Sequence, residues 1–145
     1  MIYSPAVRIM CDSGGPLAED AQVDVSVVSV AAQDLRPGRH YSKPFDPDLL
    51  REKVRAMLSV CEQHGHDAVV LGAFGCGAFQ HDPKNVAKVF QELLTQEFRV
   101  FRVAIFAILC SKTLLDEFEK IFPALPNQDP TFVREVGEDL RVQGR

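Results

Sequence analysis

Three apolar runs that contain β-branched residues stand out along the chain. They cover residues 23–31, 67–74 and 102–109. Runs of this length and composition predict strands. The second and third runs are nearly continuous in apolar residues, which is typical of a central sheet covered on both faces. All three runs are therefore expected to be buried strands.

Helices are predicted between these runs. Asp46-Pro47 and Asp82-Pro83 each place a capping carboxylate before a proline at the first helical position. The first helix is expected to end at Gly65. Apolar residues then recur at helical spacing and define one buried stripe on each helix. The stripes are Leu49, Leu50, Val54, Met57, Leu58 and Cys61 in the first helix, and Val86, Val89, Phe90, Leu93, Leu94 and Phe98 in the second.

A third helix is predicted over residues 111–122, and the resulting order of elements is a βαβ alternation. That order predicts an α/β fold, a three-layer α/β/α sandwich with a mainly parallel or mixed sheet. Residues 36–47 and 123–130 are proline-rich connectors, and neither is long enough to separate independent domains. Residues 131–140 are expected to form at most a short helix, and the tail to residue 145 to fray.

Composition narrows the class of protein. The chain has 145 residues, 46% hydrophobic and 25% charged, which predicts a single soluble domain over residues 1–145. The net charge of −4, without a block of like charges, argues against a broad nucleic-acid surface. No run approaches the roughly 18 apolar residues of a membrane span. Residues 1–10 lack the positive n-region and the apolar h-region that a signal peptide is expected to have. Four scattered cysteines without a CxxC pair favour a reducing location, the cytoplasm or the nucleus of a eukaryote.

The segment with the clearest chemistry is the glycine loop at residues 72–79, which follows the second predicted strand and precedes the second Asp-Pro helix. Ligands of open α/β sheets bind at the carboxyl ends of strands. Gly72, Gly75 and Gly77 permit positive φ and let successive backbone N–H groups converge on an anion, so a phosphate or diphosphate is the expected guest. Because no Lys or Arg lies between Asp67 and Phe79, amide donors would bind it. The alternative is a tight turn whose glycines serve only packing.

For each of the other candidate functional residues, a simpler structural explanation is available. Cys76 could be a nucleophile on a sharp turn, but Phe74 and Ala78 occupy the positions where such an elbow has glycine, which favours an inert thiol. Cys61, His64 and His66 have the types of zinc ligands but coincide with a helix end, so no metal is expected. His81 could lie near a ligand, although an exposed loop histidine is the favoured interpretation. The acidic pairs Glu19-Asp20, Asp116-Glu117 and Glu138-Asp139 are expected to be solvated.

The glycine loop and its surroundings also carry a family resemblance. The stretch HGHDAVVLGAFGCGAFQHDPKNVAKVF at residues 64–90 resembles the microbial-type poly(ADP-ribose) glycohydrolases of the macro-domain superfamily. IYSPAVRI at residues 2–9, VSVVSVAA at 25–32 and FRVAIFAI at 101–108 are similar to the same family in the same order. The resemblance implies a macro-domain sheet that binds ADP-ribose. It further implies that the loop wraps the diphosphate through Gly72, Gly75, Cys76, Gly77 and Ala78, that Phe79 lies against the distal ribose, and that Phe74 packs beneath.

Departures from the family pattern shape the functional expectation. Family members carry a glycine triplet and a catalytic Gln-Glu-Glu motif before the YSP segment, and this chain is expected to start too late to contain them. Gly14-Gly15-Pro16 follows that segment, and Gln91-Glu92 and Gln96-Glu97 lack the second glutamate, so no catalytic residue is carried over. Where the family tends to have Pro-Asn after a strand, this chain has Ala32-Gln33-Asp34, so no ligand contact is carried over from there.

Together these observations predict an ADP-ribose-binding, macro-domain-like module without the recognised catalytic glutamates. The alternatives are an active glycohydrolase whose carboxylates come from elsewhere, and an interaction or scaffolding domain without a ligand. The expected partners are ADP-ribose or an ADP-ribosylated protein, with no cofactor. A homodimer is also predicted, because a second copy would cover a sheet edge or apolar patch that the chain leaves exposed.

Overall fold

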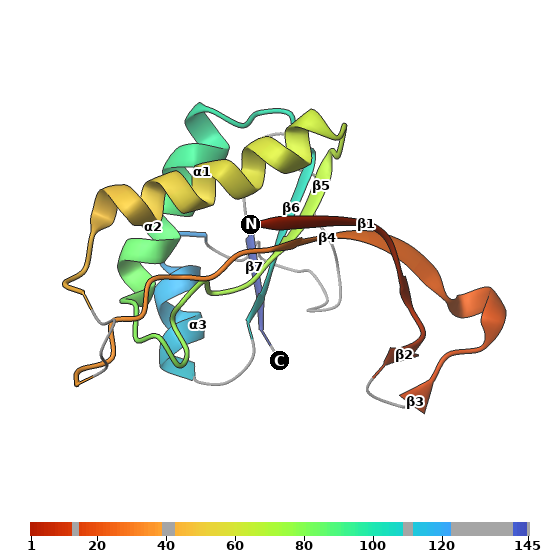
Figure 1. Cartoon of the computed structure of the whole chain (residues 1–145), viewed down its shortest axis with the longest axis horizontal. Helices are drawn as coiled ribbons and strands as arrows, with labels where there is room; N and C mark the ends of the chain where they lie inside the picture. The colour runs from red at the N-terminus through yellow and green to blue at the C-terminus, as the bar shows by residue number, and fades with distance from the viewer. Residues whose placement is uncertain (13–14, 39–42, 109–111, 123–140, 145) are drawn as a thin grey trace. The chain divides into compact units, whose positions relative to one another are not determined.

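The computed structural model describes residues 1–12, 15–38, 43–108, 112–122 and 141–144 (Figure 1). By its internal contacts the chain divides into two compact units, Met1–Ala31 and Ala32–Arg145. The single-domain organisation therefore stays a prediction. The first unit contains β1 (Ile2–Ile9), β2 (Cys11–Asp12), β3 (Gly15–Pro16), a short 3₁₀ helix (Glu19–Ala21) and β4 (Val23–Ser29). The second contains α1 (Pro47–Gln63), β5 (Ala68–Leu71), α2 (Pro83–Gln96), β6 (Val103–Ile108), α3 (Lys112–Glu119) and β7 (Arg141–Gly144).

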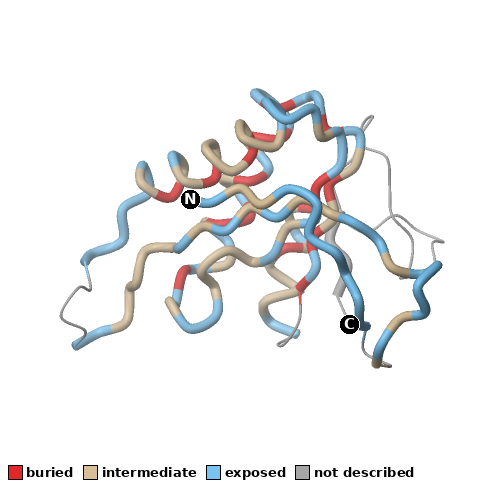
Figure 2. The backbone as a smooth tube through the Cα atoms, turned by 45° about the vertical axis from the view of Figure 1, so that its right-hand side comes forward, coloured by how far each residue is buried: buried red, intermediate tan, exposed pale blue. Residues whose placement is uncertain are grey.

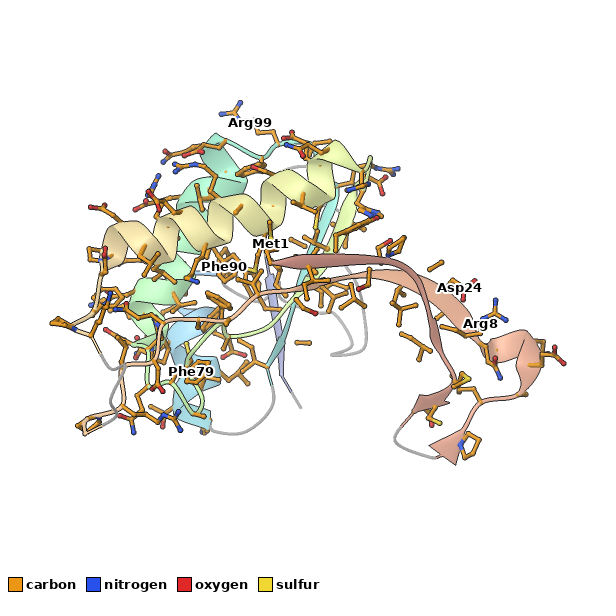
Figure 3. All side chains as sticks on the ribbon, viewed as in Figure 1. Met1, Arg8, Asp24, Phe79, Phe90 and Arg99 are labelled. Carbon is orange, nitrogen blue, oxygen red and sulfur yellow. The ribbon has the colours of Figure 1, made fainter. Side chains whose placement is uncertain are left out.

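The first unit is an antiparallel ribbon. β1 and β4 pair from Ile2↔Ser29 to Ile9↔Val23, and β2 pairs with β3 beyond them. Arg8 forms a two-pronged ion pair with Asp24 across the ribbon, with Nε–Oδ1 at 2.8 Å and Nη2–Oδ2 at 2.9 Å (Figure 3). None of the described residues of this unit is buried. Residues 23–31 were expected to form a buried strand. The strand is confirmed as β4, but its burial is wrong, since Val23 is 53% exposed. A ribbon of two strands has no covering layer within its own unit.

The second unit has a parallel three-stranded sheet in the order β5-β6-β7. Ala104, Phe106 and Ile108 alternate along β6 and are all buried, so they share one face of the sheet. The ring of Phe106 contacts Phe90 of α2 at 5.2 Å and Phe118 of α3 at 5.4 Å between centroids. Helices α2 and α3 therefore cover this face, and α1 packs beside α2. The buried positions of this core appear red in Figure 2.

The opposite face of this sheet is more open than the apolar runs predict. Val69 of β5 is buried, but its neighbour Val70 is 70% exposed and Ala107 of β6 is exposed as well. The described residues of this unit therefore do not cover both faces of these strands, contrary to the expectation. The α/β class is confirmed, and the described strands fit the expected mainly parallel or mixed arrangement: β5, β6 and β7 are parallel, whereas the pairs of the first unit are antiparallel. The apolar composition of a strand shows that it suits burial, whereas the covering layer depends on other segments.

The Asp-Pro helices form where the sequence predicts them. Asp46 accepts a hydrogen bond from the Leu49 N–H at 3.0 Å, and Asp82 accepts one from the Lys84 N–H at 3.0 Å. Gly65 follows α1 with φ of +77°, as expected for a helix end. The predicted stripes face the core, with Leu50, Val54, Leu58, Val86, Phe90, Leu93 and Leu94 all buried. No helix in the described ranges has the length and apolar character that a membrane span requires.

The third helix is confirmed over Lys112–Glu119, with Phe118 buried in it and Phe122 buried just after it. Ser111 and Cys110, the connector 123–130, the expected short helix at 131–140 and Gly14 lie outside the described residues.

Candidate functional site

The glycine loop lies between Leu71, the last residue of β5, and Asp82, the N-cap of α2. It therefore leaves the carboxyl end of a parallel strand, as predicted. Three backbone hydrogen bonds fold it into a compact turn: Cys76 N–H to the Ala73 oxygen at 3.0 Å, Gln80 N–H to the Gly77 oxygen at 3.1 Å, and His81 N–H to the Gly75 oxygen at 3.0 Å. The loop is thus shaped by its own backbone.

The three glycines of the loop have different surroundings. Gly75 has φ of +77°, and a Cβ built there would lie 2.5 Å from His81 Cδ2 and 2.9 Å from Ala32 Cβ. Gly72 and Gly77 do not have positive φ, and a Cβ at either meets no other atom within 4 Å. Gly75 therefore serves close packing, as the tight-turn interpretation predicts. Gly72, Gly77 and Ala78 are exposed, and the open space beside Gly72 and Gly77 suits the anion-site interpretation.

His81 is the buried polar residue of this region, with only 3% of its surface exposed. Its Nε2 lies 2.8 Å from the Gln33 carbonyl oxygen. Because a carbonyl only accepts, Nε2 carries a proton. Nδ1 has no hydrogen-bond partner among the described residues, and the ring meets Phe45 edge-on at 5.9 Å. The expectation of an exposed loop histidine is therefore wrong: the chain turns back beneath Gly75, and the ring fills the space that the glycine leaves.

A second segment lies against the loop. The Leu35 N–H donates to the Phe79 carbonyl oxygen at 3.2 Å, and the Arg36 guanidinium carbon lies 5.4 Å from the centre of the Phe79 ring. Asp34 binds Arg36 through Nε at 2.8 Å and Nη2 at 2.6 Å, and these hydrogen bonds raise the pKa of Arg36. The sequence pointed to no contact from Ala32-Gln33-Asp34 and did not single out Arg36. No local pattern connects a residue at position 36 with one at 79.

Cys76 has the surroundings of an inert thiol. Burial raises its pKa to about 12, and the nearby charge of Asp82 acts in the same direction. Reactive thiols instead lie in positive surroundings that lower the pKa. Cys61 also has a raised pKa because of burial. Throughout the described ranges, no group of at least three His, Cys, Asp or Glu side chains is placed to hold a metal ion.

Those candidate carboxylates that lie in the described residues do not gather at the loop. Glu92 is ion-paired with Arg51, and Glu97 with Arg55 at 2.7 Å, so both link α2 and the end of that helix to α1. Glu117 of α3 pairs with Lys120, just after the end of that helix. Glu19 and Asp20 are exposed in the first unit, Asp116 is half-buried, and Glu138-Asp139 lies outside the described residues.

Comparisons with known proteins extend this picture. A scan against protein-family models gave no match, and neither did a search of curated proteins. Among solved structures, the chain is similar to poly(ADP-ribose) glycohydrolase from Deinococcus radiodurans in complex with ADP-ribose, with 34% identity and a TM-score of 0.73 over 83% of this chain and 51% of that one. The apo form of that protein matches with the same identity and TM-score over 86% and 54%.

A further match is a mutant of poly(ADP-ribose) glycohydrolase from Thermomonospora curvata, with 30% identity and a TM-score of 0.66 over 83% of this chain and 48% of that one. The chain thus spans about half the length of the solved relatives it matches. Agreement in both sequence and fold confirms the resemblance found in the sequence. In both sequence and fold, the chain is similar to about half of a bacterial poly(ADP-ribose) glycohydrolase.

Proposed function

We propose that this chain binds ADP-ribose and that the loop at residues 72–79 holds the diphosphate. The ligand-loop residues of the proposal are Gly72, Gly75, Cys76, Gly77, Ala78 and Phe79. The observation that carries it is the open backbone at Gly72 and Gly77, where a Cβ would have no other atom within 4 Å. It occurs at the carboxyl end of a parallel strand, in a chain 34% identical to a protein solved with ADP-ribose.

The different surroundings of the loop residues support this proposal. Gly75 sets the curvature of the turn by packing on His81 and Ala32. Gly72 and Gly77 on either side of it are exposed and carry no Cβ, which leaves room for a phosphate to approach the backbone. Backbone N–H groups bind phosphate oxygens without a side-chain charge. Cys76 contributes its backbone, because a thiol with a pKa of about 12 is neutral at physiological pH.

Titration calorimetry with ADP-ribose tests the proposal, and Gly77→Val is the informative variant. A Cβ at this position meets no other atom within 4 Å and Gly77 is exposed, so the variant should fold, yet its side chain would occupy the space beside the loop. We expect it to abolish ADP-ribose binding with only a modest loss of stability. Ala68→Val adds two methyl groups at an exposed position at the start of β5 and should bind normally. Absence of binding by the unmodified chain at millimolar ADP-ribose would leave the ligand-free scaffolding domain as the better account.

Hydrolysis is a second candidate function, favoured by the activity for which the solved relatives are named. Release of free ADP-ribose from poly(ADP-ribose) measures it directly. An inert purified chain that still binds ADP-ribose would limit this chain to binding. The expected homodimer and the cytoplasmic or nuclear location stay predictions.

A further inference from the structure

The proposed ligand carries two phosphate groups, whereas the loop at residues 72–79 has no cationic side chain. The structure places a cationic side chain, that of Arg36, beside this loop. The Arg36 guanidinium lies over the ring of Phe79, 5.4 Å from its centre, and Phe79 is labelled in Figure 3. This is within the range of a cation–π contact. Arg36 is far from Phe79 in the sequence, so the contact depends on the fold.

The segment that carries Arg36 is held against the loop region by several bonds. Leu35 donates from its backbone N–H to the Phe79 oxygen at 3.2 Å, and His81 donates from Nε2 to the Gln33 oxygen at 2.8 Å. The Gln33 side-chain amide in turn donates to the Pro44 oxygen at 2.7 Å. Because His81 is buried and also fills the space beneath Gly75, the segment and the loop share one support. Arg36 is therefore placed by the same residues that shape the loop.

The direction of the guanidinium is fixed as well. Asp34 accepts from Nε and Nη2 of Arg36 in a two-pronged arrangement, which restrains the guanidinium plane. Nη1 has no hydrogen bond within the part of the chain that the structure describes, and about a third of the side chain, 32%, is exposed. The pair has no net charge. Arg36 thus offers directed N–H donors at short range, and long-range attraction of an anion would be weak.

We propose that Arg36 is a specificity-determining residue of this site and that its Nη1 edge donates hydrogen bonds to a phosphate oxygen of the ligand held by the loop amides. The proposal rests on the proposed function, since it needs a phosphate-bearing ligand at residues 72–79. It assigns the Asp34–Arg36 pair a role that the sequence alone did not assign. A merely structural role for Arg36 would be to support the Phe79 ring, and the experiment must separate the two.

The experiment compares ADP-ribose affinity by calorimetry in the unmodified chain, Arg36→Gln, Arg36→Lys and the control Arg102→Gln. Arg102 is exposed before the start of β6, which is the opposite end of the sheet from the loop. A hydrogen bond between a guanidinium and a phosphate is charge-assisted, so Arg36→Gln should weaken binding by about tenfold or more. Arg36→Lys should restore little of the lost affinity. A lysine ammonium cannot form the two-pronged hydrogen bond with Asp34 and also donate to a phosphate oxygen in the way a guanidinium can. Arg102→Gln should bind like the unmodified chain.

A second readout separates contact from support. In ¹⁵N-labelled unmodified protein, the Arg36 side-chain N–H resonances, assigned by their loss in Arg36→Lys, should shift on saturation with ADP-ribose. Unchanged resonances, or an Arg36→Gln affinity within about twofold of the unmodified chain, would overturn the role of Arg36 while leaving ADP-ribose binding intact. An unmodified chain that binds no ADP-ribose would instead overturn the proposed function, and this inference with it.

Discussion

The two units of the chain hold their strands in different ways. In the unit Met1–Ala31, β1 and β4 pair edge to edge, and no described side chain is buried. In the unit Ala32–Arg145, Phe106 of β6 is fully buried and stacks on Phe122 at 4.8 Å between ring centres. Burial of apolar surface stabilises far more than hydrogen bonds and ion pairs that water can replace. The difference indicates that the stability of the described chain is concentrated in the second unit, which also carries the candidate loop.

The largest expected effect is that of removing the central aromatic ring of the core. Phe106→Ala should destabilise the chain by about 3–5 kcal/mol, because it deletes a fully buried ring and leaves a cavity. Val27→Ala in the ribbon is the comparison: Val27 is 37% exposed, and its truncation should cost below about 1 kcal/mol. Urea unfolding followed by circular dichroism measures both. Equal losses for the two variants would show that the ribbon contributes a core of its own.

The next effect concerns whether the tight packing of the second unit extends into the loop. Gly75→Ala should destabilise by about 2 kcal/mol, because its φ of +77° is unfavourable for alanine and the new methyl would lie 2.5 Å from the His81 ring. Gly15 in the ribbon also has positive φ, +119°, but open space around it, so Gly15→Ala adds backbone strain without a clash. Gly77→Ala, with neither feature, serves as the control within the loop. Thermal unfolding should rank the three variants in that order, and a harmless Gly75→Ala would mean that the loop is not packed on His81.

The same contrast shows what the sequence could and could not predict. The Asp-Pro helices were predictable because a cap acts on backbone groups a few residues away, as Asp82 does on Lys84. The place of the glycine loop followed from its neighbours in the chain. Burial of β4 was mispredicted, because valines suit a strand whether or not a layer covers it. The roles of His81 and Arg36 were missed for a related reason, since the partner of His81 is 48 residues away.

The smallest expected effect is in the acid range and compares one carboxylate from each unit. Hydrogen bonds from Arg55 hold the pKa of Glu97 below its ordinary value, with a further contribution from Arg51. Hydrogen bonds from Arg8 hold the pKa of Asp24 below its ordinary value in the ribbon. A lowered pKa in the folded state means that the ionised carboxylate favours folding. Each contribution is therefore present above the pKa of the unfolded chain and is lost as the pH falls through the folded value.

Glu97→Gln should consequently be less stable than the unmodified chain at pH 7. The difference should begin to shrink near about pH 4, the ordinary range for a carboxyl group, and should vanish only below the lowered pKa of Glu97 in the folded chain. Asp24→Asn should follow the same course with a smaller amplitude, because Asp24 pairs with a single arginine on an exposed ribbon whereas Glu97 pairs with two. Both differences should shrink in about 1 M salt, since exposed ion pairs are screened. Urea unfolding at a series of pH values measures them. A larger pH response from Asp24→Asn than from Glu97→Gln would reverse the ranking of the two units, because the ribbon would then depend on its ion pair more than the second unit depends on the bridge between α1 and α2.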